Sequence, residues 1–242
     1  MLEQVKILTS RRAYEFEADA IRLSMVSIQP IQQQIQQLFR FQSSVIGSPM
    51  ATFGVVPLTY PPGIVFNLGA WVHQEKYIVP IRFLHFEQNR IVIDVAGPTD
   101  AIDGIADHLF HFLSGLEAAD RSPIVGEPER ALDYSEITAR FPYPLDTILP
   151  KPLRRLLSKT MSIGAGDKSM TMIPAVAIRA FSTDEVLPAV PSATDPYAFT
   201  FTLRPGTRPE EHIYFSSAPL GSEAHLNYLN ELEAAFTRSH QT

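Results

Sequence analysis

Two runs of alternating apolar residues, separated by only three residues, constrain the fold more than any other feature of the sequence. They are KYIVPIRFLHF at 76–86 and RIVIDVAG at 90–97. Alternation with a period of two is typical of a strand with one buried face, and a three-residue loop joins antiparallel neighbours. Asn89 suits the last loop position, where the backbone is often left-handed. The pair therefore predicts a β-hairpin in an antiparallel sheet.

The register of this hairpin predicts a cross-strand ion pair. A three-residue loop places Arg82 opposite Asp94, and Leu84 and Val92 then share their face of the sheet. The opposite face is expected to carry the other apolar residues of the two strands, namely Tyr77, Val79, Ile81, Phe83, Ile91, Ile93 and Val95. Ion pairs of this kind are common in sheets, so we expect Arg82 and Asp94 to have a structural role.

The other apolar patterns predict an α+β chain in which one order of elements occurs twice. In the first half we expect strands at 20–27, 51–58 and 63–73 besides the hairpin, and helices at 30–41 and 97–116, the second with Thr99 as its N-cap. In the second half we expect strands at 135–141, 170–181, 197–203 and 212–217, helices at 152–161 and 222–236, and an irregular loop at 182–196. The halves are predicted at 1–117 and 131–242, joined by a connector at 118–130.

A match between two helix-to-strand exits supports internal duplication. IGSPMATFGVVP at 46–57 aligns without a gap on IGAGDKSMTMIP at 163–174, with Ile, Gly and Pro shared at the ends. The repeated order β-α-β(3-4)-α resembles the arrangement of TATA-box-binding-protein-like folds, in topology only. That resemblance implies a largely antiparallel, curved sheet with helices on one face. A DNA-binding sheet of this type needs a basic face with inserted aromatic side chains, whereas the face predicted here carries Arg82, Asp94 and Asn67 among apolar residues, which argues against DNA.

The composition excludes several kinds of chemistry. The 242 residues include no cysteine, so disulfides, thiolate metal sites and a cysteine nucleophile are impossible. Acidic residues outnumber basic ones by 26 to 20, and a chain with a net charge of -6 is a poor general binder of nucleic acid. The N-terminus lacks the apolar core of a signal peptide, and no run approaches the ~18 apolar residues of a membrane span. We therefore expect a soluble cytoplasmic protein without membrane contact.

A glycine-rich stretch, SIGAGDKS at 162–169, looks at first like a phosphate-binding loop. Asp167 separates the second glycine from Lys168, and the predicted order is helix then strand, so phosphate would face the negative end of the helix. Gly164 as a left-handed helix cap is the simpler interpretation. The preceding helix and this stretch together nevertheless form a local basic cluster that is a candidate contact for an anion or an acidic partner: Arg154, Arg155 and Lys159 from the helix, and Lys168 from the stretch.

Acidic and histidine residues gather in the helix predicted at 97–116. They are Asp100, Asp103, Asp107, His108 and His111. Asp107 and His111 are four residues apart, a spacing that can place both on one metal ion, but acids in a first helical turn also stabilise the helix by themselves. No partner helix offers a second set of ligands, and no cofactor-binding motif is present. The sequence therefore predicts a polar helix face and neither a metal nor a cofactor. His85 is expected to be a hydrogen-bonded sheet residue.

The helix predicted at 30–41 has an unusual polar face, built from glutamines without a charged residue. Gln33, Gln34 and Gln37 are its candidate interface residues, because amides can hydrogen-bond across an interface without the desolvation cost of a charge. The function we favour is a non-catalytic protein-binding or assembly module in a homo- or hetero-oligomeric complex. The alternatives are a small anion- or nucleotide-binding protein or enzyme that uses the basic helix at 151–168, and a nucleic-acid-binding component, which the net charge disfavours.

Overall fold

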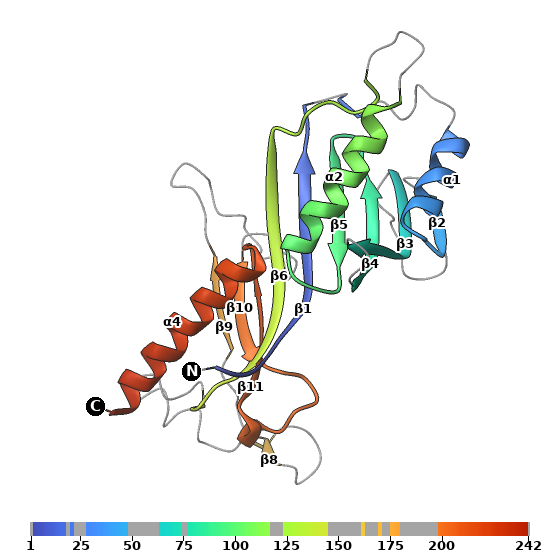
Figure 1. Ribbon diagram of the computed structural model, residues 1–242. Coiled ribbons are helices and arrows are strands. Elements are labelled where there is room, and N and C mark those ends of the chain that lie inside the picture. The colour runs from blue at the N-terminus through green and yellow to red at the C-terminus, as the bar shows by residue number, and fades with distance from the viewer. Residues whose placement is uncertain are drawn as a thin grey trace. The chain divides into compact units, whose positions relative to one another are not determined.

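The computed structural model describes ten stretches of the chain, and the fold is given for these residues. They are 2–17, 20–21, 28–47, 63–73, 77–116, 123–144, 161–162, 169–170, 175–179 and 198–241. The predicted α+β class is confirmed, with a large antiparallel sheet and, among the described residues, three α-helices (Figure 1). The chain divides into two compact units, the first Thr9–Tyr134 and the second Met1–Leu8 with Ser135–Thr242.

The first unit consists of one sheet and two helices. Its elements are the later part of β1 (Glu3–Glu15), α1 (Ile28–Leu38), β2 (Ser43–Gly47), β3 (Gly63–His73), β4 (Tyr77–Phe86), β5 (Arg90–Val95), α2 (Asp100–Ser114) and the start of β6 (Arg130–Arg140). The strand order is β2-β3-β4-β5-β1-β6, and the pairings from β2 to β1 are antiparallel. The helices at 30–41 and 97–116 and the strand at 63–73 thus form close to their predicted bounds.

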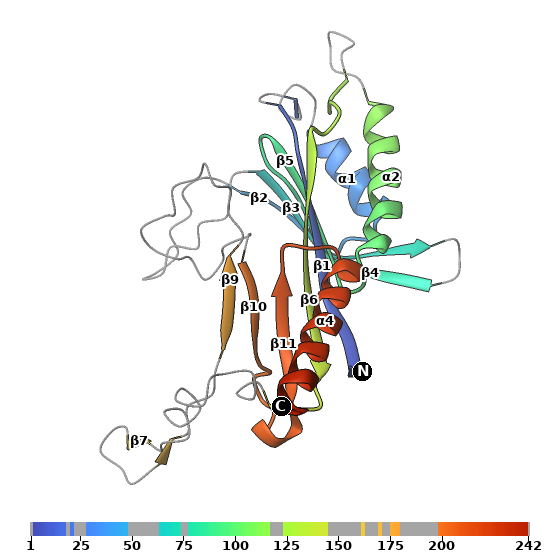
Figure 2. The same cartoon turned by 90° about the vertical axis from the view of Figure 1, so that its left-hand side faces the viewer.

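Both helices of the first unit cover the same face of its sheet (Figure 2). In α1 the buried residues Ile31 and Ile35 are four apart, as an amphipathic helix requires. In α2 the buried stripe is longer and consists of Ala101, Ile102, Ile105, Ala106, Leu109 and Leu113. These side chains pack on the inward residues of β3, β4 and β5, including Phe66, Ile81 and Ile93, each at most 1% exposed. The opposite stripe of α2 is polar and exposed.

The β4–β5 hairpin forms, but its register at the turn and a β-bulge change which residues share a face. From the turn onward the strands pair one residue away from the predicted register, with Phe86 opposite Ile91 and Phe83 rather than Arg82 opposite Asp94. The bulge between Ile81 and Phe83 then brings Ile81 opposite Val95, as the predicted register has it. Leu84 pairs with Ile93 and is buried in the core. The prediction that Leu84 shares a face with Arg82, and Phe83 the other, is therefore wrong, because a bulge adds a residue that alternation along one strand does not reveal.

The second unit has the strand order β1-β6-β11-β10-β9, with α4 packed on the sheet. Its further elements are β9 (Val176–Arg179), β10 (Ala198–Leu203), a short 3-10 helix (Pro209–Glu211), β11 (Ile213–Ala218) and α4 (Ser222–Gln241). A separate two-stranded pair consists of β7 (Met161–Ser162) and β8 (Ser169–Met170). The core contains an aromatic group in which Phe141, Phe201 and Tyr214 contact one another. The strands at 197–203 and 212–217 and the last helix were predicted.

Several elements differ from the prediction. The chain begins with the long strand β1, which the sequence pattern did not indicate, and Met161 lies in β7 rather than at the end of a helix. Thr99 precedes α2, but its side chain makes no capping hydrogen bond. Of the strand predicted at 20–27, Ile21 forms an isolated bridge with Val125, and residues 22–27 lie outside the described part of the chain. The strand predicted at 51–58 and the loop at 182–196 also lie outside it.

None of the helices in the described part of the chain combines the length and apolar character needed to cross a membrane.

Candidate functional site

A groove in the first unit brings together the acidic and histidine residues that the sequence analysis singled out. We call it the α2–β3 groove; it has a volume of about 750 Å³ and is lined by Leu38, Arg40, Ala70, Trp71, Val72, Asp100, Asp103, Gly104, Asp107, His108 and His111. The α2 residues follow helical spacing, so that the polar stripe of the helix forms one wall. The other wall comes from β3, from Leu38 at the end of α1 and from Arg40, and apart from Arg40 its residues are apolar. A groove of this size suits a small ligand or a few side chains of a partner.

Trp71 and Gly104 fit closely together in this groove. A Cβ atom at position 104 would lie only 2.4 Å from Cη2 of the Trp71 ring, so only glycine leaves the ring its present position. Glycine in a helix interior costs about 1 kcal/mol relative to alanine, a cost that this close packing explains. The indole is half-buried and remains part of the groove surface.

We expect the substitution Gly104→Ala to displace the Trp71 ring rather than to stabilise the helix. Helix propensity alone would raise the free energy of unfolding by about 1 kcal/mol, but the new methyl group overlaps the indole, and overpacking typically costs 1–3 kcal/mol. Trp71 is the single tryptophan of the chain, so its emission spectrum reports the displacement directly. A clear gain in stability with an unchanged spectrum would contradict the described packing.

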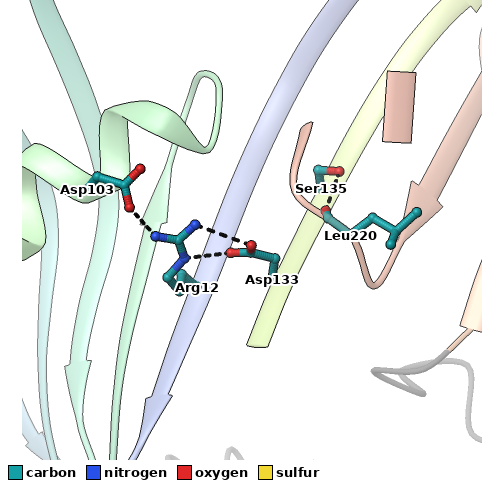
Figure 3. A network of polar contacts seen from close by, with 5 residues as sticks. All are labelled: Arg12, Asp103, Asp133, Ser135 and Leu220. Atoms are coloured by element: carbon teal, nitrogen blue, oxygen red, sulfur yellow. Dashed lines mark hydrogen bonds and ion pairs between the residues drawn. The ribbon is translucent and has the colours of Figure 1, made fainter. Parts of the chain in front are cut away.

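Arg12 joins the groove to the sheet beneath it. Its guanidinium forms an ion pair with Asp103 of α2 and a two-pronged hydrogen bond with Asp133 of β6, at 2.6 Å from Nε to Oδ1 and 3.2 Å from Nη2 to Oδ2 (Figure 3). Burial alone would lower the pKa of Arg12, but hydrogen bonds to Asp133 and Tyr14 outweigh it and raise the pKa. The charge of Asp103 is therefore partly compensated from within the protein, because Asp103 shares the single positive charge of Arg12 with Asp133.

The two remaining carboxylates of the groove lack such compensation. Asp100 and Asp107 are exposed, and neither forms an ion pair with any residue that the structure describes. Arg40 is the one cationic side chain in the lining. The spacing of Asp107 and His111 raised the possibility of a metal, but the described residues contain no group of three histidine or acidic side chains arranged to hold one. The groove instead combines acidic and aromatic surface.

A second polar site surrounds Asp94, which is fully buried in β5. We call Asp94, Thr9, Arg11 and Arg82 the Asp94 cluster. The carboxylate accepts hydrogen bonds from Thr9 Oγ1 at 3.0 Å and Arg11 Nε at 2.9 Å, and Arg82 Nε lies 3.4 Å from Oδ1. The predicted Arg82–Asp94 ion pair thus forms, but sequence reasoning missed Arg11. Its guanidinium also lies over the rings of Phe83 and Tyr134, at 5.1 and 5.5 Å from their centroids.

His85 lies on the neighbouring strand β4 and is buried, as expected of a sheet residue. Its Nδ1 lies 3.2 Å from Oε1 of Glu87, while its Nε2 has no hydrogen-bond partner among the described residues. Burial alone would raise the pKa of Glu87, but contacts with His85 and Arg90 lower it below its usual value. These contacts fix the end of the β4–β5 hairpin.

A buried histidine in the second unit contacts two serines. The ring of His225 on α4 lies with Nδ1 2.9 Å from Ser135 Oγ and Nε2 2.8 Å from Ser216 Oγ. Ser135 donates to the carbonyl of Leu220 at 2.8 Å (Figure 3). A catalytic serine–histidine pair needs an accessible nucleophile, yet His225 is fully buried and both serines are inside the fold. The network therefore attaches α4 to β6 and β11.

The predicted glutamine residues lie on a surface that has little charge. Gln33, Gln34 and Gln37 are all exposed on α1. The adjoining strand β2, which was not predicted, ends the strand order of the described sheet, and its Val45 and Ile46 are 42% and 58% exposed. A hydrogen bond of 2.6 Å from Gln32 to Ser44 ties the helix to the strand. We call residues 28–47 the α1–β2 surface; Arg40 is its single charged residue.

The other predicted site lies outside the described residues. Arg154, Arg155, Lys159 and Lys168, and with them the phosphate-loop question at 163–168, therefore stay predictions.

No protein-family model matches the sequence, and a search of the curated proteins finds no significant relative.

Proposed function

We propose that the protein is a non-catalytic assembly module that binds a second copy of its own chain through the α1–β2 surface. The observation that carries this proposal is that β2, an edge strand in the described part of the sheet, has two exposed apolar residues and lies beside an exposed helix face of uncharged amides. Edge strands of natural proteins are usually protected by charged residues, proline or a covering element. The strand SSVIG contains no charged residue and no proline. It is therefore suited to pairing with another strand.

The chemistry of the surface favours a second copy over a charged partner. Two copies related by a two-fold axis present the same residues to each other, so the surface has to be complementary to itself. A charged face repels its own copy, whereas a glutamine amide both donates and accepts hydrogen bonds and pairs with another glutamine. Antiparallel pairing of β2 with β2 also places the exposed apolar side chains of the two strands against each other, which removes them from water.

We expect Ile46→Lys to weaken self-association without unfolding the protein. A lysine at this position of β2 introduces a charge that pairing would have to desolvate, and we expect the dimer to be weaker by at least roughly tenfold, or about 1.4 kcal/mol. Sedimentation velocity over a roughly hundredfold range of protein concentration gives the mass of each variant and its dependence on concentration.

Ile78→Lys is the matched control for this experiment, because Ile78 is an equally exposed apolar strand residue, at 62%, but lies on β4. It should associate like the wild type. A wild-type protein that stays monomeric at the highest concentration, or an equal loss of mass in both variants, would contradict the proposed interface.

We also infer that the two units descend from an internal duplication, as the repeated order of elements in the sequence predicted. What supports this is the matching order of pairing in the two units. The order β3-β4-β5-β1 in the first unit corresponds to β9-β10-β11-β6 in the second, and all of these neighbours whose register is defined are antiparallel. In the first unit α2 follows β5, the strand that pairs with β1. In the second unit α4 follows β11, the strand that pairs with β6.

A further inference from the structure

We propose that the α2–β3 groove binds a lysine or arginine side chain on an exposed segment of a partner protein. This inference rests on the proposed role as a protein-binding module, but the groove meets the α1–β2 surface only at Leu38 and Arg40. It differs from that surface in being acidic, because three carboxylates of one helix face lie along it. The two surfaces therefore call for partners of different chemistry.

The balance of charge in the groove selects a cation. Asp103 pairs with Arg12, so a ligand meets chiefly the exposed carboxylates of Asp100 and Asp107. These two carboxylates outnumber Arg40, the one lysine or arginine among the described residues of the lining. Asp100 and Asp107 share one side of α2 but are seven positions, or about 10.5 Å along the helix axis, apart, so each can face a different cation of one bound segment. An anion at this place would be repelled by the same two carboxylates.

The opposite wall of the groove selects a cation with an apolar body. Leu38, Ala70 and Val72 provide aliphatic surface, and Trp71 provides the aromatic ring with the strongest cation–π attraction. Lysine and arginine place a chain of methylene groups next to their charge, and such side chains bury the methylenes while the charged end stays polar. A carboxylate on one wall and an indole on the other match the two parts of such a side chain.

The open form of the groove favours a protein segment over a free amine. Asp100, Asp107 and Arg40 are exposed, so a small amine in the groove would stay largely hydrated and gain little. A peptide segment gains additional contacts from the residues beside its cation. The groove also ends at Leu38 and Arg40, next to the uncharged residues of α1, so a bound segment has neighbouring surface to contact.

The test is a titration followed by tryptophan fluorescence, because Trp71 is the single tryptophan of the chain and lies in the groove. The probe is the peptide acetyl-Gly-Lys-Gly-Lys-Gly-amide, compared with its Glu-for-Lys counterpart and with n-butylamine. We expect a saturable change in emission with the lysine peptide, none with the glutamate peptide, and a much weaker effect of n-butylamine. The double variant Asp100→Asn with Asp107→Asn should weaken binding of the lysine peptide roughly tenfold, since each exposed ion pair contributes up to about 1 kcal/mol.

A charge-matched variant separates the groove from the net charge of the protein. Glu223→Gln with Glu231→Gln removes two exposed carboxylates of α4 and should bind the lysine peptide like the wild type. The proposal is overturned if the lysine peptide gives no saturable change, if both double variants weaken it equally, or if n-butylamine binds as tightly as the peptide. Ile46→Lys in the same titration distinguishes the two proposals, because loss of the proposed dimer contact should leave binding of the lysine peptide unchanged.

Discussion

Replacing Asp94 by alanine is expected to lower the free energy of unfolding by about 3 kcal/mol, the largest effect that we expect from a single side chain. The carboxylate is fully buried, accepts a hydrogen bond from Thr9 and forms ion pairs with Arg11 and Arg82. Removing one partner of a buried ion pair typically costs 3–5 kcal/mol, because the other charge stays without compensation. The lower end applies here, since the side chains of Arg11 and Arg82 are 41% and 51% exposed and can still reach water.

Two further variants test whether the cost arises from the charge. Asp94→Asn keeps the shape and an acceptor for Thr9 Oγ1 but loses the negative charge, so it should fall between the wild type and Asp94→Ala. Arg82→Ala should cost no more than about 1 kcal/mol, because Arg82 is half-exposed and its Nε lies 3.4 Å from the carboxylate. Urea unfolding at pH 7 followed by circular dichroism gives all three values. Similar losses for Arg82→Ala and Asp94→Ala would contradict the central role of Asp94.

The strands that the sequence predicted are those whose pattern is visible locally. The strands β3, β4 and β5 alternate or carry continuous apolar runs, and their bounds follow the pattern closely. The strand β1 was missed because it contains consecutive arginines, which read as a polar segment. Arg11 and Arg12 are acceptable there because Asp94 and Asp133, far along the chain, neutralise them. A pattern confined to neighbouring residues does not show such distant partners.

Only the α2 wall of the candidate groove could be predicted, because the other wall comes from residues that are distant in the sequence. Helical spacing placed Asp100, Asp107 and His111 on the polar face of α2, and that prediction agrees with the groove lining. Trp71 belongs to β3, and no local pattern brings it next to α2. Gly104, in the interior of an otherwise regular helix, is the signal that could have indicated a close neighbour. The bulge at Arg82 had no comparable signal, so the face of Leu84 was assigned wrongly.

The second large effect is expected from pH, and it depends on His225. Burial lowers the pKa of His225 from 6.5 to about 4 in the folded protein. Above pH 6.5 the ring is neutral in both the folded and the unfolded chain, so it adds no pH dependence there. As the pH falls from 6.5 towards 4, the unfolded chain takes up the proton first, and the free energy of unfolding decreases. Below about pH 4 the folded state takes it up as well, and the contribution levels off at a loss of about 3 kcal/mol.

This loss should be absent from His225→Gln and retained in His111→Gln. A glutamine at 225 can still bond to Ser135 and Ser216 but has no proton to gain, so its unfolding free energy should depend less steeply on pH between 6.5 and 4. His111 is exposed on α2, and its replacement controls for the loss of one histidine. Urea unfolding at half-unit steps across this interval measures the slopes, and the carboxylates, common to all three proteins, cancel in the comparison. Parallel slopes for wild type and His225→Gln would mean that the buried ring takes up its proton as readily in the fold as in the unfolded chain, and the attachment of α4 would then not depend on a neutral histidine.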